Sequence, residues 1–495
     1  MLSLIIFLPL AAAVLLAATR LPDTVARWLW VATSTAVLVL VAVLWLRREP
    51  ATTSGLSAEA QVPWIPSVGA SYHVGVDGLS LPLLGLTAVI FVACAGYALR
   101  EQDRPRAHAA LFLFLETTCL GVFAAQDLIV FFVFFDLAIV GMYFAISRWG
   151  HGDAQRSALK FFLYTFLGSL ALLGGFIGLY VGADPHTFDM VELAREAPLR
   201  GQPVVAGFVL AALLLGLAVK TPTVPFHTWL PPAHTDASAV GSAVLAGVLL
   251  KMGTYGFVRV AMPMLPDTWR SFAGVIVVVG VVSVLYGALV ALAQTDLKRM
   301  IAYTSVNHMG YVVLGVGVAG LGSPSDAVAR QVAVTGAVTQ MVSHGLITGA
   351  LFLLAGVLHE RRQDYALSGY GGLARTAPRL ATLFAVAAFA SLGLPGFSGF
   401  VAEFQIFSGS IAVAAGTAVA LLGILITAAL FLRALQRIFT GPTQGGSVGF
   451  DDLRPHEVVA AGTLMALSVA IGIAPRPMLD VVEPAARTLV GLVSR

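Results

Sequence analysis

The sequence predicts an all-α, polytopic membrane protein that folds as one helix bundle. Of its 495 residues, 58% are hydrophobic and only 11% are charged. The mean hydropathy is +0.88, which is typical of membrane proteins and excludes an ordinary soluble globular protein. Apolar runs long enough to cross a hydrocarbon core about 30 Å thick recur along the whole chain. We therefore expect about 14 transmembrane helices on the hydropathy criterion.

The expected spans follow one another with short loops between them. They cover approximately residues 2–19, 28–46, 79–99, 108–125, 128–147, 158–182, 204–232, 237–261, 271–293, 299–320, 332–358, 379–409, 414–438 and 456–474. The longest loop, 47–78, is too short for a soluble domain, and 476–495 is expected to form a short surface helix. No positively charged region precedes the first apolar run, so we expect a retained span and not a cleaved signal peptide.

Lysine and arginine are biased towards alternate loops. More of them fall on the side that holds Arg20, Arg27 and Arg148 than on the other side. Because positively charged loops face the cytoplasm in multi-pass membrane proteins, we expect both termini to lie on the outer side of the cell's inner (plasma) membrane. The chain has no basic or acidic block, which argues against nucleic acid as a partner.

Two spans are interrupted by proline and glycine. The seventh breaks at the run KTPTVPF, which begins at Lys220, and the twelfth breaks at LPGFSGFVAEF, which contains Glu403. Proline removes a backbone donor and ends a helix, and broken helices at membrane depth are packed in protein or line a wet cavity. The two breaks lie five spans apart, so they would belong to inverted repeats, a pattern typical of transport sites. Simple proline kinks are the alternative.

Ionisable side chains at membrane depth are the candidate functional groups, because a charge in lipid is costly. The principal candidates are Asp136, Lys220, Lys251 and Glu403. Glu116 is a candidate supporting acid. Histidine titrates near neutral pH and can relay protons, and the histidines in or beside spans are His227, His234, His308 and His344. The alternative for all of these groups is structural: salt bridges between helices, or hydrogen-bonded packing of the histidines.

The aromatic and charged residues at span ends have a simpler interpretation. Trp28 and Trp229 are expected to lie in the aromatic belts at the membrane interface. Asp296, Lys298 and Arg299 are expected to anchor the start of the tenth span at the same interface.

Residues for cofactor chemistry are missing from the sequence. Cys94 and Cys119, the two cysteines, lie in apolar runs and are expected to be small packing residues. The sequence contains no dinucleotide-binding motif, no P-loop, no cysteine ladder for an iron–sulfur cluster and no set of zinc ligands. We therefore expect no redox active site, cofactor or metal in this chain, and an energy source in an ion gradient or in partner chains.

Five runs of residues resemble the antiporter-like, proton-translocating membrane subunits of respiratory complex I, the NADH:quinone oxidoreductase. The most specific is VKTPTVPFHTWLPPAHTDASAVGSAVLAGVLLKMGTYGFVR, and the others are YTSVNHMGYVVLG, QMVSHGLITGALFLLAGVLHERR, LGLPGFSGFVAEF and DLRPHEVVAAGTLMALSVAIGIAPRPMLD. The resemblance covers nearly the whole chain. It is closest to the M type of this family, which has a glutamate in the broken twelfth span, as Glu403 is here. The L and N types usually have lysine at that place.

The resemblance implies 14 helices with two inverted five-helix repeats. The chain would then comprise a three-helix segment (1–107), two repeats that each form a proton half-channel (108–261 and 271–438), and a C-terminal helix with a short surface segment (439–495). The resemblance also implies proton transfer through Asp136, Lys220, Lys251 and Glu403, supported by Glu116. NADH, FMN, iron–sulfur clusters and quinone would be bound by partner subunits, and L-type and N-type subunits would be neighbours in the lipid bilayer.

Two features depart from the family pattern. Asp136 stands where the family normally has glutamate, and the segment HTDASAVGSAV differs from the usual version, which contains glutamate and proline. A subunit of a multi-subunit cation/proton antiporter or of a membrane-bound hydrogenase-type complex is therefore the alternative function. A structural scaffold, in which the charges only hold helices together, is a third.

Overall fold

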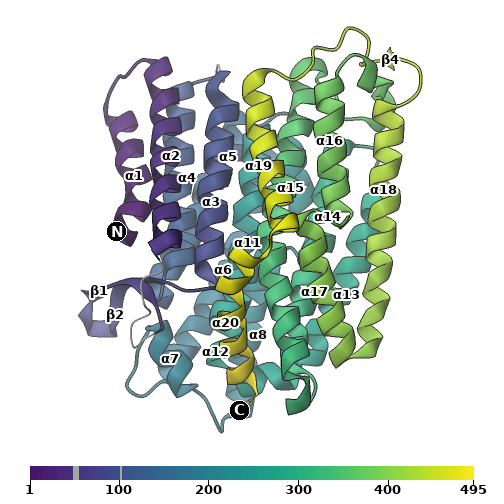
Figure 1. Ribbon diagram of the computed structural model, residues 1–495. Helices are drawn as coiled ribbons and strands as arrows, with labels where there is room; N and C mark the ends of the chain where they lie inside the picture. Colours follow the sequence, from purple (N-terminus) through teal and green to yellow (C-terminus); the bar gives the residue numbers. More distant parts are fainter. Residues whose placement is uncertain (48–54, 101–102, 495) are drawn as a thin grey trace.

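The computed structural model describes residues 1–47, 55–100 and 103–494 and is an upright bundle of long helices (Figure 1). Within these ranges, 11 helices are long and apolar enough to cross a membrane. Shorter apolar helices cover Leu2–Ala18, Pro378–Ser391 and Ser398–Val413. All the expected spans fall on helices, and the polytopic helical fold is confirmed.

The helices of the first half are mostly single, uninterrupted rods. They are α1 (Leu2–Ala18), α2 (Asp23–Arg47), α3 (Ser80–Tyr97), α4 (Pro105–Ala124), α5 (Leu128–Trp149), α6 (Ala154–Gly182), the short α7 (Met190–Glu196), α8 (Pro203–Lys220) and the short α9 (Leu230–Asp236). The next span is composite: α10 (Ala239–Val244), α11 (Leu250–Gly256) and α12 (Met262–Met264) are joined by two π-helical segments, η3 (Leu245–Leu249) and η4 (Phe257–Ala261).

The second half continues the same bundle. Its helices are α13 (Pro266–Ala293), α14 (Leu297–Gly317), α15 (Ala327–Arg362), α16 (Pro378–Ser391), α17 (Ser398–Val413), α18 (Leu421–Phe439), α19 (Pro455–Ile473) and α20 (Arg476–Val493). The expected short helix at 476–495 is present as α20, which buries one face against α15.

Helix starts follow from local chemistry. Proline occupies the first turn of α4, α8, α13, α16 and α19, where an N–H group would have no partner within the helix. Asp127, Asp189 and Asp296 cap α5, α7 and α14, because each carboxylate accepts hydrogen bonds from backbone N–H groups in the following turn.

Two small antiparallel sheets are additions that the sequence analysis did not predict. The loop 47–78 contains the hairpin of β1 (Ser57–Ile65) and β2 (Ala70–Val76), with Val62 opposite Tyr72. Gly69 closes the turn at a φ of 66°, a backbone conformation that suits glycine. The second sheet pairs β3 (Tyr370–Gly371) with β4 (Gln444–Gly445). Figure 1 shows β1 and β2 at the lower left of the bundle, below the N-terminus, and β4 at the upper end.

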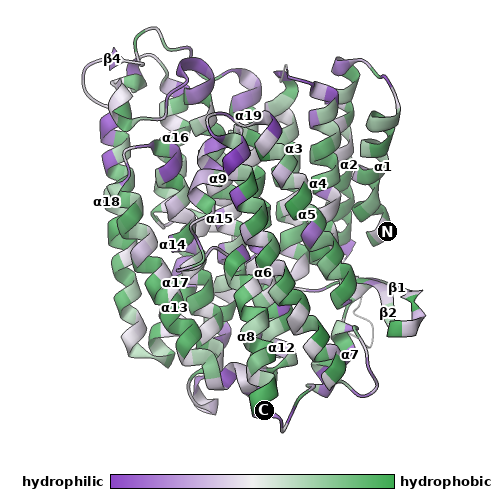
Figure 2. Cartoon of the chain, turned by 180° about the vertical axis from the view of Figure 1, so that it is seen from behind, coloured by the Kyte–Doolittle hydropathy of each residue, from purple (hydrophilic) through white to green (hydrophobic). Residues whose placement is uncertain are grey.

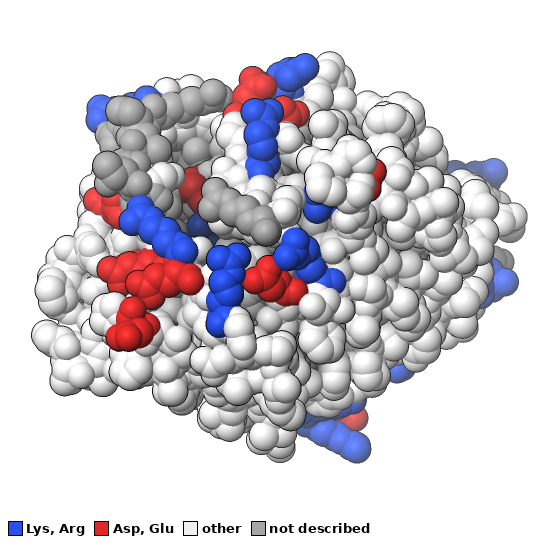
Figure 3. All heavy atoms as spheres, turned by 90° about the horizontal axis from the view of Figure 1, so that it is seen from below, with Lys and Arg blue, Asp and Glu red and all other residues white. Residues whose placement is uncertain are grey.

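The long helix α15 forms the centre of the bundle. Every residue from Ala333 to Leu358 is buried, and α15 packs against α3, α10, α14, α16, α17, α19 and α20. Figure 2 shows that the helices are mostly hydrophobic along their length, with hydrophilic residues at the ends of the bundle and around α9. Seen from below, acidic and basic side chains are interspersed on the lower end (Figure 3). Polar groups on α15 are therefore shielded from the surroundings by a full layer of helices.

Both predicted helix breaks are present. The helix α8 ends at Lys220, and residues 221–229 are non-helical until α9 begins at Leu230. In the second half α16 ends at Ser391 and α17 begins at Ser398, with Gly393 and Gly396 at φ values of 69° and 99° between them. The breaks place Lys220 and Glu403 beside irregular backbone, as the proline and glycine pattern indicated.

Two expectations for the membrane interface are wrong. Trp28 is exposed, as expected of a belt residue, but Trp229 is fully buried and its Nε1 donates a hydrogen bond to Val219 O at 2.9 Å. Lys298 is also fully buried instead of anchoring a helix at the surface. Trp229 is the last residue of a non-helical stretch, and Lys298 lies in the first turn of α14. Hydropathy alone does not show that neighbouring helices cover residues at such positions.

Candidate functional site

Four of the predicted intramembrane groups, Lys251, His308, His344 and Glu403, lie on α11, α14, α15 and α17 in the centre of the bundle. Lys220, Lys251 and Glu403 are buried, as are the four candidate histidines and Glu116. Asp136 is half-buried on α5. Buried polar groups are costly unless they are partnered, so the contacts of each group indicate how the site is organised.

Lys251 lies on α11, between the two π-helical segments. Its Nζ donates a hydrogen bond to Ala246 O on η3 and lies 2.7 Å from Nδ1 of His344 on α15. Single π-turns inside α-helices are frequent at functional sites because they change the direction in which side chains and carbonyls point. Here the first π-turn brings a backbone carbonyl to the lysine ammonium group.

Two histidines continue from Lys251 towards Glu403. The rings of His344 and His308 are 5.5 Å apart between centroids and cross at 72°. His308 Nε2 on α14 lies 4.0 Å from Glu403 Oε1 on α17. Lys251, His344, His308 and Glu403 therefore form one contiguous series across four helices, which we call the central series.

Glu403 is held against the broken backbone between α16 and α17. A Cβ atom built on Gly393 would lie 2.3 Å from Glu403 Oε2, so only glycine permits this approach. The glycine in the break thus provides space for the carboxylate that ends the central series.

Lys220 and Asp136 are separated in this conformation. Lys220 Nζ makes no hydrogen bond to any described residue and lies 4.8 Å from the centroid of the Phe135 ring and 6.0 Å from that of Phe161. Asp136 Oδ1 is likewise buried without a hydrogen-bond partner in the described part of the chain. The Asp136 charge still acts on Lys220, but without a carboxylate at ion-pair distance the ammonium is stabilised less than in a direct Lys–Asp pair.

Glu116 has a partner that the sequence analysis did not predict. Thr117 and Thr118 follow it directly, but Thr118 Oγ1 donates to Leu115 O, and Thr117 Oγ1 has no partner among the described residues. Instead Ser34 Oγ on α2 donates a hydrogen bond of 2.6 Å to Glu116 Oε2. The N-terminal three-helix segment therefore contributes directly to the site.

The other two candidate histidines lie outside the central series. His227 is in the non-helical stretch before α9, where its ring is 5.0 Å from Tyr286 and 6.2 Å from Tyr303. The His234 ring stacks on Phe352 at 4.5 Å, and neither of its nitrogens has a partner within the described ranges. Both Lys251 and Lys298 act electrostatically on His234. His234 is therefore near enough to both lysines to be affected by their charges.

Lys298 is a buried group that the sequence analysis assigned to the interface. Its Nζ donates hydrogen bonds to Ala237 O and, at 3.4 Å, to Thr235 O, and lies 5.1 Å from the centroid of the Tyr365 ring. Helical spacing could have indicated its burial, because Ile301, Ala302 and Ser305 on the same face of α14 are apolar or small.

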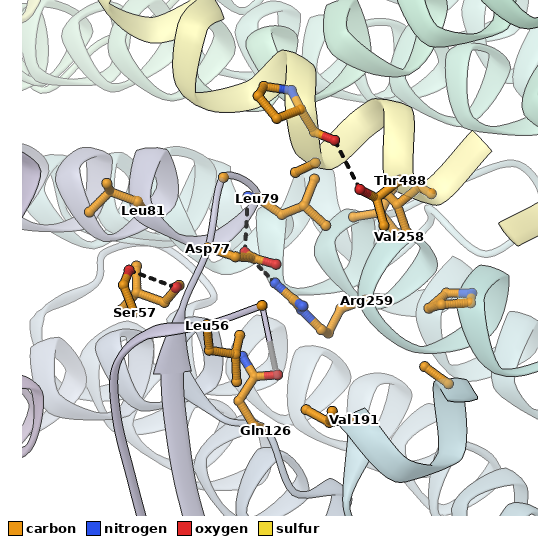
Figure 4. Close-up of a pocket in the computed structure, with 18 of the residues that line it drawn as sticks. Leu56, Ser57, Asp77, Leu79, Leu81, Gln126, Val191, Val258, Arg259 and Thr488 are labelled. Atoms are coloured by element: carbon orange, nitrogen blue, oxygen red, sulfur yellow. Dashed lines mark hydrogen bonds and ion pairs between the residues drawn. The ribbon is translucent and has the colours of Figure 1, made fainter. Parts of the chain in front are cut away.

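A separate polar pocket opens near the lower end of the bundle. Figure 4 shows Arg259 of η4 pointing towards Asp77, and Nη2 of Arg259 donates a hydrogen bond of 2.5 Å to Asp77 Oδ1. Burial acts to raise the pKa of Asp77, but the Arg259 charge and the hydrogen bonds from Ser80 and Leu79 are stronger together and lower that pKa. The pocket has a volume of about 640 Å³, and Arg259 links it to the helix that carries Lys251.

No group of three histidine, cysteine, aspartate or glutamate side chains in the described ranges is arranged to hold a metal ion. Cys94 and Cys119 are buried and free, as expected of packing residues. The buried lysine, histidine and carboxylate groups described above are all able to bind and release protons.

Comparison with known proteins identifies the family. Residues 125–429 match the family model described as NADH:quinone oxidoreductase/Mrp antiporter, TM. The chain belongs to this family. NADH-quinone oxidoreductase subunit M from Rickettsia bellii (strain RML369-C) is 36% identical over 490 residues, which cover 97% of this chain and 96% of the relative. NAD(P)H-quinone oxidoreductase chain 4 2 from Thermosynechococcus vestitus (strain NIES-2133 / IAM M-273 / BP-1) is 38% identical over 96% of this chain and 89% of the relative.

Solved structures agree with this assignment of the antiporter-like subunit. A chain of respiratory complex I from Thermus thermophilus with bound NADH has a TM-score of 0.90 and 31% identity, with full coverage of both chains. A chain of the Mrp complex from Dietzia sp. DQ12-45-1b has a TM-score of 0.86 at 22% identity, over 100% of this chain and 99% of that one, and shows the same fold. The predicted resemblance to the M-type, antiporter-like subunits of complex I is confirmed.

Proposed function

We propose that the chain is a proton-translocating membrane subunit of a complex I-type NADH:quinone oxidoreductase. The relatives named as subunit M of NADH-quinone oxidoreductase support membership of such an assembly. The observation that carries the proposal is the central series, in which Lys251, His344, His308 and Glu403 follow one another across four helices. Groups at these separations exchange protons directly or through one water molecule.

Lys220 and Asp136 would act as the switch at one end of this path. Pairing with Asp136 stabilises the Lys220 ammonium, and separation leaves it among Phe135 and Phe161, without a hydrogen bond to a described residue. Because a desolvated, unpaired ammonium releases its proton more readily, separation would drive a proton towards Lys251. From there the proton would pass through His344 and His308 to Glu403, with Glu116, His227 and His234 as supporting groups.

The redox chemistry would belong to partner subunits. NADH, FMN, iron–sulfur clusters and quinone would bind outside this chain, and L-type and N-type antiporter-like subunits would be its neighbours in the membrane. The exposed apolar side chains on the outer faces of the bundle, such as Phe144, Leu167 and Phe208, suit contact with lipid or with such neighbours. We place the upper end in Figure 1 in the cytoplasm and both termini outside, since the chain passes from α1 to α2 at that end and this connection contains Arg20.

The test uses the assembled complex in proteoliposomes. Lys220→Ala and Lys251→Ala are expected to lower the number of protons moved per electron transferred from NADH to quinone, with assembly preserved. Arg437→Ala is the control, because Arg437 is exposed on α18, away from the proposed path. An unchanged proton-to-electron ratio in both buried-lysine variants would rule out the proposed path.

A cation/proton antiporter subunit is the second candidate, because the family description covers both kinds of protein. Copurification of the native complex separates the two. Partner chains that carry flavin and iron–sulfur clusters support the oxidoreductase, whereas their absence together with sodium-dependent proton exchange supports the antiporter.

A further inference from the structure

Three aromatic side chains form a stack on the upper side of the bundle, outside the central series. The rings of His151, in the loop between α5 and α6, and His359, in the last turn of α15, are stacked with centroids 4.0 Å apart and 21° between planes. Tyr365 stacks on His359 at 4.8 Å and 15°. Its hydroxyl also lies 3.4 Å from His151 Nε2. We call these three residues the histidine–tyrosine stack.

The stack lies directly against Lys298. Nζ of Lys298 is 5.1 Å from the centroid of the Tyr365 ring, and the backbone N–H of Leu297 donates a hydrogen bond to Tyr365 O. The backbone N–H of His151 donates to Asp236 O, one residue from the two carbonyls that accept from Lys298. The stack and the buried lysine are thus fixed to the same end of α9.

A polar opening adjoins this place on the upper side. A cavity of about 350 Å³ is lined by Asp153, Arg156, Ser157, Lys160, Pro232, Thr235, Asp236 and Arg299. Ser157 Oγ donates a hydrogen bond of 2.5 Å to Asp236 Oδ2 inside it. The cavity therefore reaches from exposed charged side chains to Thr235, whose carbonyl holds Lys298.

Burial increases stepwise from this opening towards Lys251. His151 and His359 are partly exposed, Tyr365 is buried, and Lys298, His234 and Lys251 are fully buried. The charges of Lys298 and Lys251 both act on His234. The titratable groups around α9 therefore become more buried from the aqueous side towards Lys251.

Electrostatics limits the stack to one extra proton at a time. Two imidazolium rings 4.0 Å apart would repel each other strongly, and a charged Lys298 adds to that repulsion. The other charged groups that face the cluster are Asp296 on α14, Asp236 on α9, and Glu360 and Asp364 around the end of α15. Burial, followed by the charges of Lys298 and His359, lowers the pKa of His151 to about 3. His151 is therefore neutral at rest and holds a proton only briefly.

We infer that the His151–His359 pair is a proton-loading gate that delivers protons from the upper aqueous side to Lys298. The inference rests on the proposed function and extends it to the uptake side. A proton from water binds a free ring nitrogen of one histidine and forms an imidazolium. That N–H bond then breaks, the neutral amine of Lys298 gains the proton as an ammonium, and the imidazole returns to its neutral form. While Lys298 is charged, its field prevents a second proton from loading.

The double variant His151→Phe plus His359→Phe tests the gate in the assembled complex. Phenylalanine keeps a stacked aromatic pair but cannot carry a proton, so a structural role would survive while proton loading would not. We expect the rate of proton uptake to fall by about 10²-fold, because a positioned acid–base group is lost. Each single variant is expected to lie between the double variant and the unmodified protein. His456→Phe is the matched control, because His456 is a partly exposed histidine at the start of α19, outside the stack, and its loss is expected to keep most of the rate.

Rescue by a soluble proton carrier separates the gate from a packing defect. Added imidazole is expected to restore part of the uptake rate in the double variant, because it can deliver protons in place of the missing rings, whereas it cannot repair packing. A double variant that takes up protons at the unmodified rate overturns the gate. If Lys251→Ala still abolishes pumping in that case, the proposed function stands without the gate; if neither variant changes pumping, both fail. Should the double variant not assemble, the two single variants decide in the same way.

Discussion

Nδ1 of His344 lies 2.7 Å from Nζ of Lys251, and no carboxylate pairs with this lysine in the described part of the chain. The two groups share one hydrogen bond, so a proton on Lys251 requires an unprotonated nitrogen on His344. A proton that moves to His344 then faces His308, whose ring centroid is 5.5 Å away. The pair therefore determines the direction in which the Lys251 proton can leave.

Replacement of His344 by alanine is expected to stop proton transfer from Lys251 to Glu403. The helices should still pack, because a small cavity in α15 replaces one imidazole. The measurement is the proton-to-electron ratio of the complex in proteoliposomes, and we expect a fall of about 10²-fold in coupled transfer through this subunit. His186→Ala is the control, since His186 is exposed in the loop before α7. Equal ratios in the two variants would contradict a relay role for His344.

Substitution of Ser34 by alanine is expected to destabilise the packing of α2 against α4. It removes the only hydrogen bond that the described residues give to the buried Glu116 carboxyl group, at a cost of about 1–3 kcal/mol. Thermal unfolding of the purified complex measures the loss. In a Glu116→Leu background the same serine change should cost much less, and equal costs in both backgrounds would show that the hydrogen bond contributes nothing.

Gly393→Ala is expected to displace the Glu403 carboxylate. The new Cβ would lie 2.3 Å from Glu403 Oε2, at a φ of 69° that alanine adopts with strain of about 1–3 kcal/mol. Glu403 would move away from His308, so proton transfer should fall even where the complex still assembles. Gly462→Ala on α19 is the control, because nothing lies within 4 Å of its Cβ position. Pumping that survives Gly393→Ala would show that the His308–Glu403 approach is dispensable.

The β1–β2 hairpin is expected to loosen as pH rises. His73 on β2 lies between two carboxylates, with Nδ1 at 2.6 Å from Asp189 Oδ2 and Nε2 at 2.8 Å from Glu59 Oε1. Burial acts to lower the pKa of His73, but the hydrogen bonds and charges of Asp189 and Glu59 together raise it. A raised pKa in the folded state stabilises the hairpin below the ordinary histidine value of about 6.5, and this stabilisation disappears as pH rises through the higher folded value.

Hydrogen exchange of the β1 and β2 amides across this pH range measures the effect. Protection beyond the intrinsic pH dependence of exchange should decrease above neutral pH, and His73→Gln should abolish that decrease. Equal hydrogen-exchange protection of the hairpin amides in both proteins at all pH values would show that the contacts of His73 with Asp189 and Glu59 do not stabilise the hairpin.

The sequence predicted what depends on local chemistry. Proline and glycine runs located both helix breaks, and charge at membrane depth located Lys220, Lys251 and Glu403. What depends on packing between distant segments was not predicted. Lys298 and Trp229 lie at span ends, and only the neighbouring helices bury them. Ser34 meets Glu116 across 82 positions of the chain, and no local pattern marks such a partner. The β1–β2 hairpin was not predicted because Pro63 interrupts the sequence pattern of the first strand.

The two π-helical segments, η3 and η4, enclose α11 and therefore Lys251. A π-turn holds one residue more than an α-turn. Its conversion to regular α-helix therefore rotates all following residues of the span by about 100° about the helix axis. Movement of one π-turn along the span past Lys251 would turn only the residues that it passes and leave the rest of the span in place. The direction in which the Lys251 side chain points can thus change while the neighbouring helices stay in place. The bundle does not need to open for this change.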